Sequence, residues 1–302
     1  MKAQYRHRTY KAGATIEVEE TYPTRYGDLL TRKNHKKPTP EAMRIYNEEQ
    51  AIRKLTRLIN ENFKPEDWFI TLHYEKHNRP KTLEEAEQML SYFMRKLRVL
   101  YKKYGVELKY VKRTAFGDRG AVHHHIIIPK GVTIQEINIL WREFVKATFG
   151  ARPPEYRSLY DTGEYSSLAA YIVKQKSGDN PYTKKWISSR NLKRPLPERD
   201  QYVEDIKWRE PPVARAGYYI DTDSIRAGCN PINGRPYLFY RMVKFPPNFV
   251  CYDDDGNRLT DKAATKFFRD KNKRWLKDNW AELNPEGEIV FRKDVETIRQ
   301  NE

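Results

Sequence analysis

The sequence predicts an α+β fold, with an antiparallel sheet of about five strands and helices packed mainly on one of its faces. Short runs rich in aromatic and β-branched residues, as at 68–74 and 121–129, alternate with longer segments whose apolar residues recur every three or four positions. The segment 117–120, Gly-Asp-Arg-Gly, has the composition of a tight turn between two strands and predicts an antiparallel pair. Helical connections combined with such a pair are typical of the α+β class.

The N-terminal part of the chain begins with a basic stretch and continues into a helix and a strand. Residues 1–40 are polar and basic without a clear period, so we expect a basic N-terminal arm. Apolar side chains recur at helical spacing over residues 40–62, and Pro65 follows shortly after, so a helix is predicted there. Residues 68–74, Trp-Phe-Ile-Thr-Leu-His-Tyr, are predicted to form a strand.

The middle of the chain carries the clearest helical pattern. Residues 83–104 place apolar side chains on one face, and Gly105 closes the helix. Strands are expected at 107–116 and 121–129. Two further helices are expected at 133–148 and 164–176, the second after a connection with a possible short strand. We therefore assign residues 41–180 to one core domain, which includes the helix that follows the arm.

Residues 181–302 are less regular and are predicted to form a C-terminal accessory region. Prolines recur between residues 181 and 212, so regular structure there should be short. A hairpin is expected near residues 235–244, and a basic amphipathic helix at about 261–280. This helix would present to solvent Lys266, Arg269, Lys273 and Arg274.

The composition predicts binding to nucleic acid. The 57 Lys and Arg residues exceed the 41 Asp and Glu residues by 16 charges. The commonest partner of such a basic protein is nucleic acid, because neutralising its phosphates releases counterions and so supplies binding affinity. The chain also holds 21 Tyr, 12 Phe and 6 Trp, many of them beside basic residues, as in Lys184-Lys185-Trp186. Aromatic platforms beside cations suit unpaired bases, which favours a single-stranded partner.

Cysteine usage and hydropathy exclude other classes. Cys229 and Cys251 are the only cysteines and lie in unrelated contexts, so neither a disulfide framework nor a cysteine-based zinc site is indicated. No apolar run approaches the length of a membrane span, and the N-terminus lacks the apolar segment of a secretory signal. We expect a soluble cytoplasmic protein without a membrane partner.

Three of the seven histidines stand together as His123-His124-His125 in the expected strand 121–129. Successive side chains of a strand point to opposite faces, so His123 and His125 share one face and His124 lies on the other. Two imidazoles side by side can bind a divalent metal ion. We therefore predict a metal site at His123 and His125.

A tyrosine and a lysine downstream supply the groups that a metal-assisted reaction would need. Tyr171 and Lys174 are three residues apart in the expected helix 164–176 and so lie on one face. A phenolate can attack a phosphodiester when a metal polarises the phosphate and a cation offsets its charge. Tyr171 is the predicted nucleophile and Lys174 the cation; Tyr160 and Tyr165 are the alternatives if the helix is phased differently.

This ordered set resembles the HUH endonucleases, specifically the replication initiator (Rep) proteins of rolling-circle plasmids and phages. The first family motif, hydrophobic-hydrophobic-Thr-Leu-Thr, is similar to residues 69–73, Phe-Ile-Thr-Leu-His. The second, His-hydrophobic-His, is matched by residues 123–125, and the third, Tyr-x-x-Lys, by residues 171–174. The resemblance covers about residues 65–180 and implies a nuclease core of the RRM or ferredoxin-like type.

The resemblance also implies the chemistry. His123 and His125 would bind Mg²⁺ or Mn²⁺, and Tyr171 would nick one strand of single-stranded or hairpin DNA at a replication origin. The products would be a 5′-phosphotyrosyl link, steadied by Lys174, and a 3′-hydroxyl that primes synthesis. No Gly-x-x-x-x-Gly-Lys-Ser/Thr loop is present, so unwinding would fall to a host helicase and synthesis to a host polymerase.

The sequence departs from the family at two positions near the histidines. Many relatives add a carboxylate ligand about eight residues before the first histidine, where this chain has Ala115. The third ligand would then be water or another residue, and His73 and Asp118 are the candidates. His124 replaces an apolar residue and is expected to face the helix-covered side with a hydrogen-bond partner. DNA contacts are expected from Thr71, Arg190 and the basic-helix residues Lys266, Arg269, Lys273 and Arg274.

Three alternatives remain open at this point. Conjugative relaxases and single-tyrosine transposases use the same chemistry, and the sequence separates them poorly from replication initiators. A non-catalytic nucleic-acid-binding module would keep the sheet and the basic surface without a metal. A metal-dependent hydrolase would attack with water and leave no covalent protein–DNA adduct.

Overall fold

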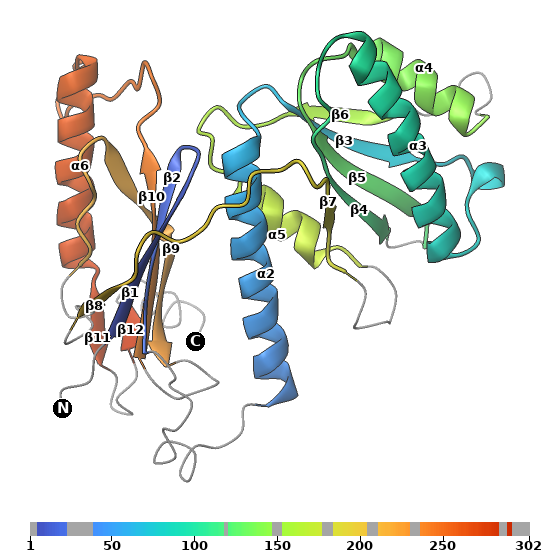
Figure 1. The fold of residues 1–302 in the computed structure, drawn as a ribbon. Coiled ribbons are helices and arrows are strands. Elements are labelled where there is room, and N and C mark those ends of the chain that lie inside the picture. The colour runs from blue at the N-terminus through green and yellow to red at the C-terminus, as the bar shows by residue number, and fades with distance from the viewer. Residues whose placement is uncertain are drawn as a thin grey trace. The chain divides into compact units, whose positions relative to one another are not determined.

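The computed structural model describes residues 5–22, 39–117, 120–146, 153–176, 184–203, 211–229, 236–283 and 289–291. The chain divides into two compact units, Glu48–Arg194 and a second unit that combines Met1–Asn47 with Pro195–Glu302. Each unit is built on a five-stranded antiparallel sheet accompanied by helices (Figure 1). The predicted α+β class is therefore confirmed.

The sheet of the unit Glu48–Arg194 places the histidine strand at its centre. The strand order is β6-β3-β5-β4-β7, formed by β3 (Trp68–His73), β4 (Val111–Phe116), β5 (Val122–Ile128), β6 (Glu155–Ser158) and β7 (Ile187–Ser188). In register, Thr71 of β3 and Arg113 of β4 flank His125 of β5. The next row on this face consists of His73, His123 and Ala115. A central strand has neighbours on both sides, so these rows are held in a fixed geometry.

Helices cover both faces of this sheet, which corrects the expectation that they pack mainly on one. α3 (Leu83–Lys103) and α4 (Ile134–Phe144) pack on the face that carries Ile70, Leu72 and Ile126. α2 (Pro40–Asn62), through its residues beyond 47, and α5 (Ser166–Lys174) pack against Phe69, Val111 and Ile127 on the other face (Figure 1). A helical period shows that one side of a helix is buried, but it does not show which face of a sheet buries it.

The second unit contains strands from both ends of the chain. Its strand order is β8-β1-β2-β10-β9, with β1 (Tyr5–Ala12), β2 (Thr15–Thr21), β8 (Gln201–Val203), β9 (Tyr218–Cys229) and β10 (Pro236–Lys244). α6 (Asp261–Asp278) packs on it through Leu276, and the short strands β11 (Ala281–Leu283) and β12 (Ile289–Phe291) pair with each other. The expected N-terminal arm is therefore wrong for residues 5–21, which form a hairpin. The accessory sheet is only in part C-terminal.

Most of the remaining predicted elements agree with the structure within a few residues. β9 and β10 form the hairpin expected near residues 235–244, and α6 is the expected basic helix. α5 ends at Lys174 because the backbone of Gln175 leaves the helical conformation. β6 occupies the place of the possible strand before α5. No helix in the described ranges is both long and apolar enough to cross a membrane.

Candidate active site

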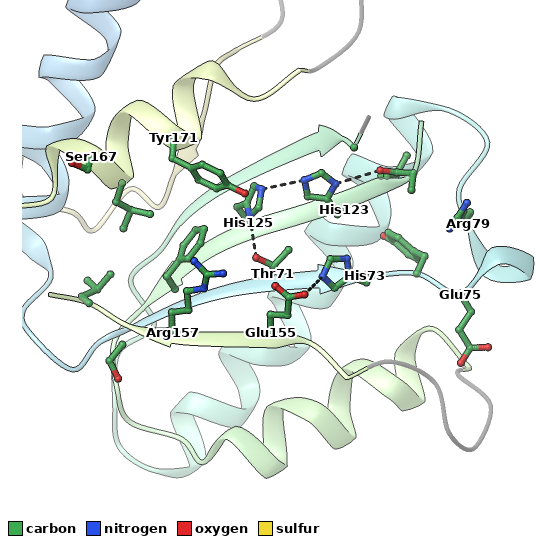
Figure 2. Close-up of a pocket in the computed structure, with 18 of the residues that line it drawn as sticks. Thr71, His73, Glu75, Arg79, His123, His125, Glu155, Arg157, Ser167 and Tyr171 are labelled. Atoms are coloured by element: carbon green, nitrogen blue, oxygen red, sulfur yellow. Dashed lines mark hydrogen bonds and ion pairs between the residues drawn. The ribbon is translucent and has the colours of Figure 1, made fainter. Parts of the chain in front are cut away.

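His123 and His125 project from β5 onto the same face of the sheet, as the strand pattern predicts (Figure 2). Their Nε2 atoms lie 3.1 Å apart. The other ring nitrogen of each side chain has a partner: the Nδ1 of His123 lies 3.3 Å from the carbonyl oxygen of Ala121, and the Nδ1 of His125 lies 3.2 Å from the Thr71 hydroxyl. These contacts orient both rings toward each other.

The orientation of the two rings fits a divalent cation. A carbonyl oxygen can only accept, so the Nδ1 of His123 carries the proton and its Nε2 presents a lone pair. If the Thr71 oxygen also accepts from Nδ1 of His125, two lone pairs face each other across 3.1 Å. One ion at about 2.1 Å from each nitrogen satisfies both. Burial, followed by the neighbouring His123 and His73, lowers the pKa of His125 to about 3, so this ring is neutral, as a metal ligand must be.

None of the positions that the sequence suggested for a third metal ligand provides one among the described residues. Ala115 lies directly beside His123, so β4 offers only a methyl group there. His73 lies beside His123 on the other side, in β3, but the ring centroids are 6.2 Å apart. Asp118 lies outside the described residues. Within the part of the chain that the structure describes, no three His, Cys, Asp or Glu side chains form a group that could hold a metal ion.

Two oxygen-bearing side chains near the histidine pair were missed by the sequence reasoning. Glu155 of β6 is in register with Thr71, and its Oε1 lies 3.5 Å from the Nε2 of His73 (Figure 2). The side chain of Gln175 lies close enough to His125 to influence the pKa of its ring. Carboxylate and amide oxygens suit hard cations such as Mg²⁺ and Mn²⁺. The four-residue β6 carried no detectable period, whereas Gln175 directly follows the Tyr-x-x-Lys motif.

α5 places Tyr171 beside the histidine pair. The Tyr171 ring lies 5.1 Å from the His125 ring, centroid to centroid, and the residue is 47% exposed, so it is accessible from solvent. Tyr165 is fully buried, and burial raises its pKa, which removes it as an alternative nucleophile. Tyr160 remains exposed.

A cavity of about 750 Å³ opens over this face of the sheet and contains the predicted metal ligands and nucleophile. Its lining includes the candidate site residues Thr71, His73, His123, His125, Tyr160 and Tyr171. Four charged side chains also line it: Glu75, Arg79, Glu155 and Arg157. Lys174 is exposed one turn beyond Tyr171, and it is not among the described residues that line the cavity. The two arginines and two glutamates balance in charge, so a bound divalent cation would make the cavity attractive to phosphate.

His124 occupies the opposite face of β5, as expected from its position in the strand. It is fully buried, and both ring nitrogens have partners: Nε2 lies 2.6 Å from the Tyr74 hydroxyl and Nδ1 lies 3.0 Å from the Thr114 hydroxyl. Burial lowers its pKa well below the usual value. The prediction of a buried, hydrogen-bonded His124 is confirmed.

Of the residues predicted to contact DNA, only Thr71 is among the described residues that line the cavity. Arg190 is exposed just after β7 in the unit Glu48–Arg194. The remaining cations are on α6 of the second unit, where Lys266, Lys273 and Arg274 are exposed and Arg269 is half-buried. Thr71 does line the cavity, but its hydroxyl contacts His125.

Comparison with family models finds a match within the unit Glu48–Arg194. Residues 67–176 match the model of the family described as replication-associated protein ORF2. The matched segment runs from β3 to α5 and therefore contains all three motifs, although it covers less than half of the chain. Neither a curated protein nor a solved structure matches the chain.

Proposed function

We propose that the protein nicks one strand of DNA and becomes joined to it through Tyr171 to initiate rolling-circle replication. The observation that carries the proposal is the position of Tyr171, whose ring lies 5.1 Å from that of His125 at an open cavity. The match of residues 67–176 to the replication-associated protein ORF2 family favours replication over conjugation or transposition as the biological setting.

His123 and His125 would hold Mg²⁺ or Mn²⁺ through their facing Nε2 atoms. The bound ion would polarise a non-bridging oxygen of the scissile phosphate and offset its charge. Thr71 and the Ala121 carbonyl keep both imidazoles in the orientation that this requires. Gln175, His73 and Glu155 are the candidates to orient water or to complete the ligand set.

The Tyr171 hydroxyl would attack phosphorus and form a new P–O bond, while the bond from phosphorus to the 3′-oxygen of the preceding nucleotide breaks. The phenolic proton leaves Tyr171, and the 3′-oxygen departs as a hydroxyl after it gains a proton from solvent. One phosphoester is exchanged for another, so the 5′-phosphotyrosyl link retains the energy needed for strand transfer. The free 3′-hydroxyl would prime synthesis by a host polymerase, with a host helicase unwinding the duplex.

A test for a covalent adduct examines this proposal directly. The protein is incubated with a pool of single-stranded and hairpin oligonucleotides and Mn²⁺, denatured, and separated by size. We expect a protein–DNA adduct that is absent with chelator, in Tyr171→Phe and in the double variant His123→Ala, His125→Ala. Tyr160→Phe serves as the matched tyrosine control and should retain the adduct.

Other outcomes identify the competing functions. Strand cutting without an adduct would indicate a metal-dependent hydrolase that uses water. Salt-sensitive binding without any cutting would indicate a non-catalytic binding module. An adduct that survives the loss of both histidines would contradict the proposed metal site.

A further inference from the structure

Arg157 and Tyr160 lie close together in the chain on the β6 side of the cavity, and both line it. Arg157 is in register with Phe69 of β3. The ring centroids of Phe69 and Tyr171 lie 6.1 Å apart. Figure 2 shows Arg157 projecting from β6 on the sheet face that carries Thr71 and over which Tyr171 projects from α5. Neither Arg157 nor Tyr160 has a role in the steps described above.

The backbone that carries these two side chains is fixed, whereas the side chains themselves are open. Leu159, between them, is buried, and its N–H donates to the carbonyl oxygen of Asp67 at 2.8 Å. The carbonyl oxygen of Tyr160 accepts from the Tyr165 hydroxyl and from the Gly163 N–H, each at 3.3 Å. The Tyr160 side chain is 50% exposed, and Arg157 has no ion pair or hydrogen-bonded side-chain partner among the described residues.

We propose that Arg157 and Tyr160 form a nucleotide subsite beside Tyr171, in which Arg157 binds a backbone phosphate and Tyr160 stacks on a base of the unpaired strand. A guanidinium can bind phosphate through two parallel hydrogen bonds, and a tyrosine ring stacks on any base. Lys174, the cation expected at the phosphate, is absent from the described cavity lining, whereas Arg157 belongs to it. The subsite rests on the proposed function because it places the strand for attack by Tyr171.

Binding to a labelled oligothymidylate of about twenty nucleotides tests the subsite without knowledge of the origin sequence. All variants are made in Tyr171→Phe protein, so that cutting does not interfere. Tyr160→Ala should weaken binding roughly five- to a hundredfold, and Tyr160→Phe should restore it, because stacking needs the ring and not the hydroxyl. Arg157→Ala should weaken binding and lower the slope of log affinity against log salt by about 0.7, the value for one phosphate contact on a single strand.

α3 offers a matched control pair on the opposite face of the sheet. Arg95 and Tyr92 are exposed there, with the Arg95 guanidinium 5.1 Å from the centre of the Tyr92 ring. Arg95→Ala and Tyr92→Ala should bind the oligonucleotide as the parent does. Thermal unfolding of every variant checks that the fold is retained.

The outcomes separate this inference from the proposed function. Parent-like binding by both Arg157→Ala and Tyr160→Ala would overturn the subsite, even if wild-type protein forms the adduct. Loss of the adduct in Tyr160→Phe would also overturn it, because Tyr160 would then act through its hydroxyl. Absence of any adduct in wild-type protein, with the predicted binding losses intact, would refute the nicking proposal and leave the subsite standing.

Discussion

At the scale of single residues, His124 explains how β5 presents the other two histidines to the cavity. A buried polar side chain is tolerated when its hydrogen bonds are satisfied, and Tyr74 and Thr114 satisfy both nitrogens of His124. A slip of β5 by one residue would exchange the faces of all three histidines and expose these partners. His124 therefore fixes the register that orients His123 and His125.

Replacing His124 should destabilise the fold much more than replacing His123. His124→Ala leaves a cavity and two buried hydroxyl groups without their partner, so we expect a loss of about 2–4 kcal/mol in the free energy of unfolding, measured with denaturant. His123→Ala, at the open cavity, should cost less than about 1 kcal/mol. Equal losses in the two variants would show that His124 does not hold the strand.

Thr71 and Thr114 allow a matched test of ligand orientation, since each hydroxyl contacts the Nδ1 of a histidine on β5. Thr71 contacts His125 on the cavity face, so Thr71→Val should weaken Mn²⁺ binding by roughly ten- to a hundredfold, measured by calorimetry. Thr114→Val acts on His124 and should leave Mn²⁺ affinity unchanged. Unaltered affinity in both variants would argue against His125 as a ligand.

At the scale of elements, Arg113 connects the sheet to the helix that bears Tyr171. It is buried in β4 beside His125 and donates to the carbonyl oxygens of Gln175 and Lys184. Burial lowers its pKa to about 10, which still leaves it charged at neutral pH. The end of α5 is held further by the Phe116 N–H, which donates to the carbonyl oxygen of Lys176 at 3.0 Å.

Arg113→Lys should slow adduct formation by about a hundredfold with little change in Mn²⁺ affinity. A lysine keeps the charge but cannot bridge both carbonyls, and a shift of about 1 Å in the attacking atom has an effect of this size. The adduct rate and the metal affinity are measured on the same preparation. A parallel loss of both would indicate general disruption of the sheet and not misplacement of Tyr171.

The two sheets differ in how far the sequence predicts them. β3, α3 and β5 have clear periods, so the inner strands of the sheet in the unit Glu48–Arg194 and the histidine pair were predictable. β1 and β2 were not predicted; in β2, Glu17, which is 1% exposed, breaks the expected alternation between buried apolar and exposed polar residues. Its partner is Arg241 on β10, more than two hundred residues away, with Nη2 to Oε1 at 3.0 Å. A contact between residues so far apart in the sequence leaves no local pattern. The contact of Glu155 in the edge strand β6 with His73 was missed for the same reason.

Arg241 on β10 contacts two carboxylates, those of Glu17 and Asp221, and we expect them to contribute unequally to the stability of this sheet. Glu17→Gln would remove the negative charge at the closer contact of the buried guanidinium, so we expect a loss of about 3–5 kcal/mol in unfolding free energy. Burial raises the pKa of Asp221, whose Oδ2 lies 3.4 Å from Nη1 of Arg241, so its ionised form is disfavoured in the fold. Any stability linked to Asp221 is therefore present at low pH and declines as pH rises through its folded pKa.

Asp221→Asn should consequently change the free energy of unfolding by less than about 1 kcal/mol at neutral pH. The free energy of unfolding of this variant should also depend less on pH just above the usual pKa range of aspartate. Denaturant titrations of both variants between acidic and neutral pH provide the comparison. If Asp221→Asn were as damaging as Glu17→Gln, Asp221 would be an essential partner of Arg241.

At the scale of the whole molecule, the excess of 16 positive charges predicts that DNA affinity falls steeply with salt. The proposed nicking reaction, by contrast, would take place in a cavity of the unit Glu48–Arg194 whose described charged residues balance. The basic residues of α6 belong to the other unit. Binding strength and chemical competence should therefore be separable by mutation.

A variant of α6 tests this separation, with glutamine at Lys266, Arg269, Lys273 and Arg274. If all four cations contact phosphate, the slope of log affinity against log salt on single-stranded DNA should fall by about 3, because each contact contributes about 0.7. The adduct formed at saturating DNA and low salt should remain, since none of the four lines the cavity. Tyr171→Phe should do the reverse, losing the adduct and keeping the slope. An unchanged slope in the α6 variant would remove α6 from the DNA-binding surface, and loss of the adduct at saturation would mean that α6 contributes to the chemistry itself.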